Sequence, residues 1–121
     1  MFTQEKMLRT GLHLAQLECG RISLEHGFWG NRDNPDRLLM LIVGEVAEAH
    51  EELRSGKRAT EVYYEETSIG KKPCGVPSEL ADIIIRVFDH AAQMGITNLA
   101  DVIIEKMKYN ESRPFKHGKQ F

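Results

Sequence analysis

The stretch "LLMLIVGEVAEAHEEL", residues 38–53, decides the fold of this chain. Six large apolar residues open it, and four glutamates follow. Because successive helical residues lie about 100° apart, Glu45 falls on the same stripe as Leu38, Glu52 returns to within about 20° of Glu45, and Glu48 lies about 60° from it. A half that is apolar all round predicts burial on every side. We therefore expect a buried helix that carries carboxylates along one edge.

Cap and turn signals divide the chain into four expected helices. Asn34 before Pro35 is typical of an N-cap, and Asn98 followed by Asp101 resembles a capping box. Strand signals are nearly absent, since only Val62–Tyr64 suggests a short strand, without an obvious partner, in the long connection 56–77. The expected helices are Thr3–His26, Pro35–Ser55, Ser78–Gly95 and Asn98–Ser112. This pattern predicts one all-α domain over residues 1–121, a bundle of about four helices.

Bulk composition excludes several classes of function. The 121 residues are 41% apolar and 28% charged, as in ordinary soluble proteins, and the formal charge of -2 predicts no affinity for nucleic acid. No apolar run approaches the roughly 20 residues of a membrane span, and the N-terminus does not resemble a signal peptide. Cys19 and Cys74 form no CxxC motif, so we expect reduced thiols in a cytoplasmic protein.

A second acidic stripe follows in the helix expected over 78–95. Its narrow polar face contains Glu79 and Asp82, at the same i, i+3 spacing as Glu45 and Glu48. One interpretation is that both stripes are simply the solvated faces of bundle helices. However, carboxylates on neighbouring buried helices repel one another strongly at low dielectric, so four of them together need cations. Hard oxygen donors in that number suit Mg²⁺, or Mn²⁺, at a site made by these four residues.

Other metal centres lack their ligands in this sequence. A di-iron carboxylate bundle needs Glu-x-x-His motifs, and no histidine here follows an acid by three positions. Soft metals need a Cys/His cluster, which is also missing from the sequence. A hard divalent cation usually binds together with a phosphate group, which predicts a phosphorylated substrate.

A phosphate needs basic partners, and the C-terminal region supplies them. Lys106, Asn110 and Arg113 follow an i, i+4, i+7 spacing and share one helix face. The alternative interpretation is a solvated helix end whose cations favour the helix dipole. Trp29, the only tryptophan, is a candidate for stacking on a nucleobase, or else it packs on the core.

Three stretches in this order, "GEVAEAHEELRSGK", "SELADIIIRVFDHAAQMGI" and "EKMKYNESRPFKHGKQF", resemble the MazG-like group of all-α nucleoside triphosphate pyrophosphohydrolases. The resemblance covers about two thirds of the chain. The family's metal pattern, EExxE…ExxD, falls on Glu45, Glu48, Glu79 and Asp82, but Gly44 replaces its first acid. Glu51 and Glu52 are candidates to compensate. The family's C-terminal Lys and Asn correspond to Lys106 and Asn110, followed by Arg113.

The resemblance implies hydrolysis of a nucleoside triphosphate to the monophosphate and pyrophosphate, in a homodimer or homotetramer. It implies a water that attacks the α-phosphorus, with Glu45 or Glu48 as its general base and Mg²⁺ as the cofactor. The substrate stays open among a deoxynucleotide such as dUTP or dCTP, a modified nucleotide, a guanosine alarmone and phosphoribosyl-ATP. A rival class is a non-catalytic nucleotide-binding module that has lost activity with its first acid.

Overall fold

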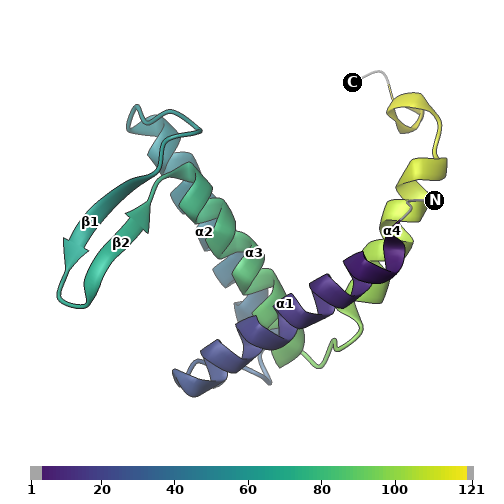
Figure 1. The fold of residues 1–121 in the computed structure, drawn as a ribbon, viewed down its shortest axis with the longest axis horizontal. Coiled ribbons are helices and arrows are strands. Elements are labelled where there is room, and N and C mark those ends of the chain that lie inside the picture. Colours follow the sequence, from purple (N-terminus) through teal and green to yellow (C-terminus); the bar gives the residue numbers. More distant parts are fainter. Residues whose placement is uncertain (1–3, 120–121) are drawn as a thin grey trace.

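The computed structural model describes residues 4–119, and four helices and one small sheet make up most of that part (Figure 1). The helices are α1 (Glu5–Glu25), α2 (Pro35–Arg54), α3 (Val76–Gln93) and α4 (Leu99–Ser112), with a short 3₁₀ turn, η1 (Phe115–Gly118). The strands are β1 (Tyr63–Thr67) and β2 (Gly70–Cys74). The mostly helical class is confirmed. None of the described helices is long and apolar enough to cross a membrane.

The helix ends test the cap predictions. The side chain of Asn34 accepts a hydrogen bond from the Arg37 backbone N–H at 3.2 Å, so the N-cap of α2 is confirmed. The capping box of α4 is wrong, because Asn98 makes no side-chain cap and Asp101 instead binds Arg9 of α1 at 2.7 Å. Thr3, where we expected the first helix to begin, lies outside the described residues.

The connection between α2 and α3 contains an antiparallel hairpin, which corrects the all-α expectation. Strand β1 does have a partner, since Tyr63 pairs with Cys74 and the pairs Glu65–Lys72 and Glu66–Lys71 place opposite charges across the ladder. Sequence periodicity missed it because most residues of both strands are exposed on both faces. Gly75 joins β2 to α3 with φ 108°, and a Cβ there would lie 2.2 Å from the Glu61 carbonyl oxygen.

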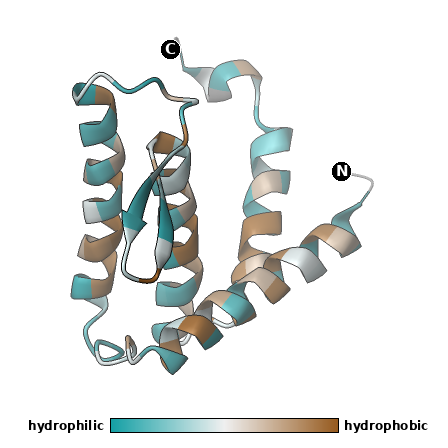
Figure 2. Ribbon diagram, turned by 60° about the vertical axis from the view of Figure 1, so that its left-hand side comes forward, coloured by the Kyte–Doolittle hydropathy of each residue, from teal (hydrophilic) through white to brown (hydrophobic). Residues whose placement is uncertain are grey.

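The helices form two pairs. Helices α2 and α3 lie side by side, and α4 crosses the N-terminal part of α1 on the other side of the molecule (Figures 1 and 2). Helix α1 also packs against α3 and so joins the pairs. The two most deeply buried large side chains are Leu38 of α2 and Ile104 of α4. Both cysteines are free thiols, as expected.

The apolar half of α2 is not buried on every side, so that expectation is wrong for a single chain. Leu38 is 1% exposed, but Leu39, Met40 and Val43 are exposed by about half or more. Meanwhile, within the described part of the chain, five polar side chains are buried: Gln16, Glu45, Asp89, His90 and Gln93. The chain therefore buries polar groups between its helices and leaves apolar stripes on the outside.

Candidate functional site

Three of the four predicted metal ligands converge between α2 and α3. One carboxylate oxygen each of Glu45, Glu48 and Glu79 lies within 4.8 Å of the other two. They meet because the acidic end of α2 runs beside the first turns of α3. The hairpin lies between these two helices in the sequence and returns the chain so that α3 packs against α2. Asp82 lies one turn further along α3 and is not part of this triad. We call Glu45, Glu48 and Glu79 the acidic cluster.

Burial and repulsion make the acidic cluster unfavourable without a counter-charge. Burial, followed by the charge of Glu48, raises the pKa of Glu79. Burial and the charge of Glu45 raise the pKa of Asp82, although Arg86 and Lys72 partly offset this. The Oε2 atom of Glu79 is buried without a hydrogen-bond partner among the described residues. An unpartnered buried carboxylate oxygen beside two further carboxylates is a donor set that fits a hard divalent cation.

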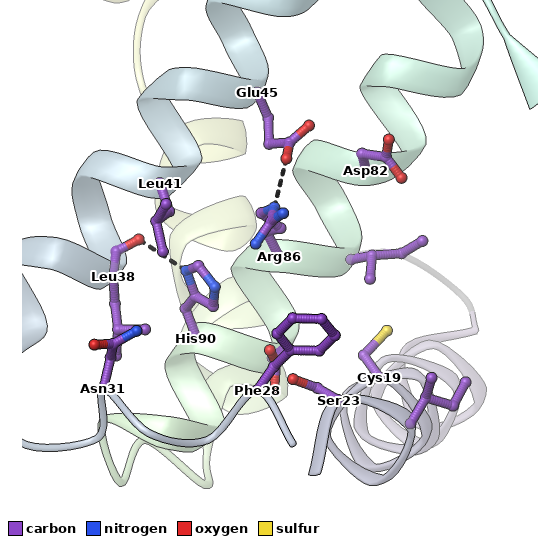
Figure 3. Close-up of a pocket in the computed structure, with 13 residues that line it drawn as sticks. Cys19, Ser23, Phe28, Asn31, Leu38, Leu41, Glu45, Asp82, Arg86 and His90 are labelled. Carbon is purple, nitrogen blue, oxygen red and sulfur yellow. Dashed lines mark hydrogen bonds and ion pairs between the residues drawn. The ribbon is translucent and has the colours of Figure 1, made fainter. Parts of the chain in front are cut away.

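Arg86 supplies a counter-charge that sequence reasoning left without a role. Its Nε atom donates a hydrogen bond to Oε1 of Glu45 at 2.5 Å, and 42% of the Arg86 side chain is exposed (Figure 3). The spacing from Asp82 to Arg86, one turn on the polar stripe of α3, is the sequence signal that could have found it. One oxygen of Glu45 thus already accepts a hydrogen bond from Arg86.

The hairpin covers the other side of the acidic cluster. A cleft of about 390 Å³ lies between α2 and the hairpin, and Glu48, Glu79 and Lys72 contribute to its lining. The Tyr63 hydroxyl donates to both carboxylate oxygens of Glu52, at 2.9 and 3.0 Å. This hydrogen bond, more than any other cause, raises the pKa of Tyr63 to about 12. Glu52, a candidate to replace the acid missing at Gly44, is thereby held by Tyr63 and lies outside the acidic cluster.

The predicted phosphate-binding residues lie elsewhere in the chain. Lys106 and Arg113 each lie 5.4 Å from the centroid of the Tyr109 ring, but Arg113 is the extended residue that follows α4 rather than part of the helix. Asn110 is exposed beside them. Helix α4 packs against α1, on the far side of the molecule from the hairpin and the acidic end of α2 (Figure 1). A single chain therefore does not bring this face to the acidic cluster.

Trp29 has a structural partner. Its indole Nε1 donates to Oδ1 of Asp89 at 3.0 Å, while Gln93 donates to Oδ2 at 2.9 Å. The ring packs against Gly20 of α1, where an added Cβ would lie 3.6 Å from it. Trp29 thus joins the loop to α1 and α3, which favours the packing interpretation over base stacking.

Comparisons of the chain with protein-family models, curated proteins and solved structures found no significant match. Its chemistry is therefore argued from its own side chains. These provide clustered carboxylates from two helices, an arginine bound to one of them, and a lysine-bearing hairpin beside them.

Proposed function

We propose that this protein hydrolyses a nucleoside triphosphate to its monophosphate and pyrophosphate, with Mg²⁺ or Mn²⁺ as cofactor. The observation that carries the proposal is the convergence of Glu45, Glu48 and Glu79, with a buried Glu79 oxygen that lacks a partner. The resemblance of the acidic and C-terminal stretches to MazG-like pyrophosphohydrolases supplies the reaction.

The acidic cluster would hold the cation, with Asp82 close enough to Glu45 for their charges to interact. Bound Mg²⁺ supplies charge neutralisation at the phosphates and lowers the pKa of coordinated water. Because the carboxylates alone would repel a polyphosphate, this substrate would bind only with a cation between its phosphates and the acidic cluster.

We assign Glu48 as the general base. The Oε1 atom of Glu45 already accepts from Arg86, whereas Glu48 is exposed and borders the hairpin cleft. Glu48 takes a proton from water as the water oxygen bonds to the α-phosphorus. The bond from the α-phosphorus to the bridging oxygen breaks, and its electron pair leaves with pyrophosphate.

Cations of the chain itself would bind the outer phosphates. Lys72 borders the cleft that Glu48 and Glu79 line, so its ammonium lies on the same side of the hairpin as the acidic cluster. Lys106, Asn110 and Arg113 are too far from the acidic cluster in one chain, as Figure 1 shows for the whole of α4. They would serve this site only if another copy of the chain presented them.

The exposed apolar stripe of α2 supports such a second copy. Leu39, Val43, Val46 and Leu53 are each about half exposed and follow the 4-3 spacing of a helix–helix contact, with His50 between them. Helix α3 adds Leu80 and Ile84, both about half exposed. Two α2–α3 pairs that cover these stripes would complete a four-helix bundle, which gives a homodimer or, with two such dimers, a homotetramer.

Release of pyrophosphate tests the proposed function. Purified protein is incubated with a panel of ribonucleoside and deoxynucleoside triphosphates, with Mg²⁺ or with excess EDTA. We expect pyrophosphate from at least one nucleotide with Mg²⁺ and none in EDTA. Binding of a nucleotide without turnover would indicate the non-catalytic module instead, and turnover that persists in EDTA would contradict the role of the acidic cluster.

A further inference from the structure

A cavity of about 410 Å³ lies between α1, α2 and α3, directly beside the acidic cluster (Figure 3). Its walls are mostly apolar and include Leu38 and Leu41 of α2 and Ile85 of α3. Phe28, in the loop after α1, contributes an aromatic ring that is 69% exposed and stands beside Arg86 and His90 in Figure 3. This combination offers a flat ligand an aromatic face and aliphatic side chains to pack against.

A few polar groups are placed within these apolar walls. Asn31 offers an amide with both donors and an acceptor, and Ser23 offers a hydroxyl. His90, 2% exposed, holds its Nδ1 at 2.8 Å from the Leu38 carbonyl oxygen. A carbonyl oxygen only accepts, so Nδ1 carries the hydrogen and Nε2 of the neutral ring is an acceptor. Donors and acceptors of this kind match the edge of a nucleobase.

One end of the cavity is charged. Glu45 and Asp82 line it, and the Arg86–Glu45 ion pair forms its border with the acidic cluster. A ligand that fills the cavity therefore has an uncharged flat part, and a cation held by the acidic cluster, as in the proposed function, would let its other end be an anionic tail. The volume is at the small end of the range for ligand sites, about 300–1,000 Å³. It suits a nucleoside, with the phosphates outside at the acidic cluster.

We propose that this cavity is the nucleoside site of the protein, with Phe28 stacking on the base and Asn31 and His90 reading its edge. The inference rests on the proposed function, which identifies the anionic tail of the ligand as its phosphates. Phe28 replaces Trp29 as the stacking residue, because the Trp29 ring packs on Gly20 and is not among the residues that line the cavity. The competing occupant is an apolar side chain of a second copy.

Cys19 provides a direct probe, because its thiol lines the cavity while the chain's other thiol, Cys74, is buried at the base of the hairpin. Alkylation of each cysteine by iodoacetamide is followed by mass spectrometry, without Mg²⁺ and without phosphates. The additives are uridine, thymidine, cytidine, adenosine and guanosine. We expect at least one nucleoside to slow the Cys19 reaction, by about tenfold at ten times its dissociation constant, and to leave Cys74 unchanged.

Two variants sharpen this test. Ser23→Phe fills the cavity and should abolish the protection by nucleoside, whereas Ser112→Phe, at the end of α4, should preserve it. Asn31→Ala should reduce the differences in protection between nucleosides. A circular dichroism melt checks that each variant folds, and the measurement on the unaltered protein decides the inference if a variant does not.

The outcomes separate this inference from the proposed function. If no nucleoside protects Cys19, or if sodium tripolyphosphate protects it equally, the nucleoside site is wrong even when Mg²⁺-dependent hydrolysis is observed. Protection of Cys19 that rises with protein concentration, without added nucleoside, would overturn the nucleoside site and indicate that a second copy fills the cavity. Protection by a nucleoside in a protein that releases no pyrophosphate would support the site and refute the proposed hydrolysis.

Discussion

The two helix pairs of this chain differ in what each leaves unpaired. Helices α2 and α3 bring carboxylates together between them and expose apolar stripes outside. Helices α1 and α4 are tied by ion pairs, from Arg9 to Asp101 and from Lys108 to Glu5, and present a basic face on α4. The first pair thus gathers carboxylates, and the second carries basic side chains at its surface. If the proposed function is correct, the complete site would combine a metal ion, a substrate and a second chain.

The largest expected effect is on the acidic cluster itself. Glu48→Gln keeps the shape of the side chain and removes the proposed general base, so we expect the rate of pyrophosphate release to fall by about 10²–10⁴-fold. Asp36→Asn, an exposed position in the first turn of the same helix, is the matched control and should keep the full rate. Wild-type turnover by Glu48→Gln would mean that Glu48 is an ordinary surface residue.

The apolar stripe of α2 should control self-association. Leu39→Glu places a carboxylate where a second copy would pack, and burial of an unpaired polar group costs roughly 2 kcal/mol or more. We expect the subunit affinity, measured by analytical ultracentrifugation, to fall by at least about 30-fold. Ile69→Glu, at the 97% exposed tip of the hairpin, should leave the assembly intact. A wild-type protein that is monomeric at micromolar concentration would refute the second copy.

The basic face of α4 should matter for the substrate although it lies far from the acidic cluster in one chain. A hydrogen bond to a charged group contributes roughly 1.5–3 kcal/mol, so Lys106→Ala should lower kcat/KM by about 10- to 100-fold. Lys108 points to another face but is not a neutral control, because its ion pair with Glu5 joins α4 to α1. Lys6→Ala, at an exposed position on α1, serves instead.

Equal losses in Lys106→Ala and Lys6→Ala, or none in either, would remove α4 from the site. Lys72→Ala then becomes the decisive variant, since Lys72 already borders the cleft beside Glu48 and Glu79. In that case the hairpin alone would bind the phosphates, and the contrast between the two helix pairs would have no bearing on catalysis.

The smallest effect is a dependence of stability on pH in the metal-free protein. The pKa of Glu79 is raised in the folded state, chiefly by burial, above its ordinary value of 4.5. Its contribution to the free energy of unfolding is therefore fully present below pH 4.5 and is lost as the pH rises through the raised pKa. In EDTA, the melting temperature of Glu79→Gln should rise relative to the wild type by a few degrees across this window. Parallel curves for the two proteins would contradict the burial of that charge.

Sequence spacing predicted those features of the site that depend on the positions of residues within a single helix. The i, i+3 spacing placed Glu45 with Glu48 on one helix face and Glu79 with Asp82 on another, although Asp82 lies outside the acidic cluster, and the apolar run around Leu38 anchored α2. Spacing could not show that Leu39 stays exposed, because a side chain covered by another helix of the chain and one covered by a second copy produce the same pattern.

Features that depend on tertiary contacts escaped the sequence. The hairpin has no apolar face to reveal its two-residue period, so Lys72 and Tyr63 could not be placed beside the acids. The Arg86–Glu45 ion pair joins residues 41 positions apart, and only the packing of α3 on α2 brings them together. Trp29 was open to two interpretations until its bond to Asp89 was seen.

Hydrolysis in water enriched with ¹⁸O tests the central claim most directly. The protein, Mg²⁺ and the preferred triphosphate are incubated, and the products are analysed by mass spectrometry. The account predicts one ¹⁸O atom in the nucleoside monophosphate and none in the pyrophosphate, because water attacks the α-phosphorus. Nucleoside diphosphate with ¹⁸O in orthophosphate, or ¹⁸O in the pyrophosphate, would contradict it.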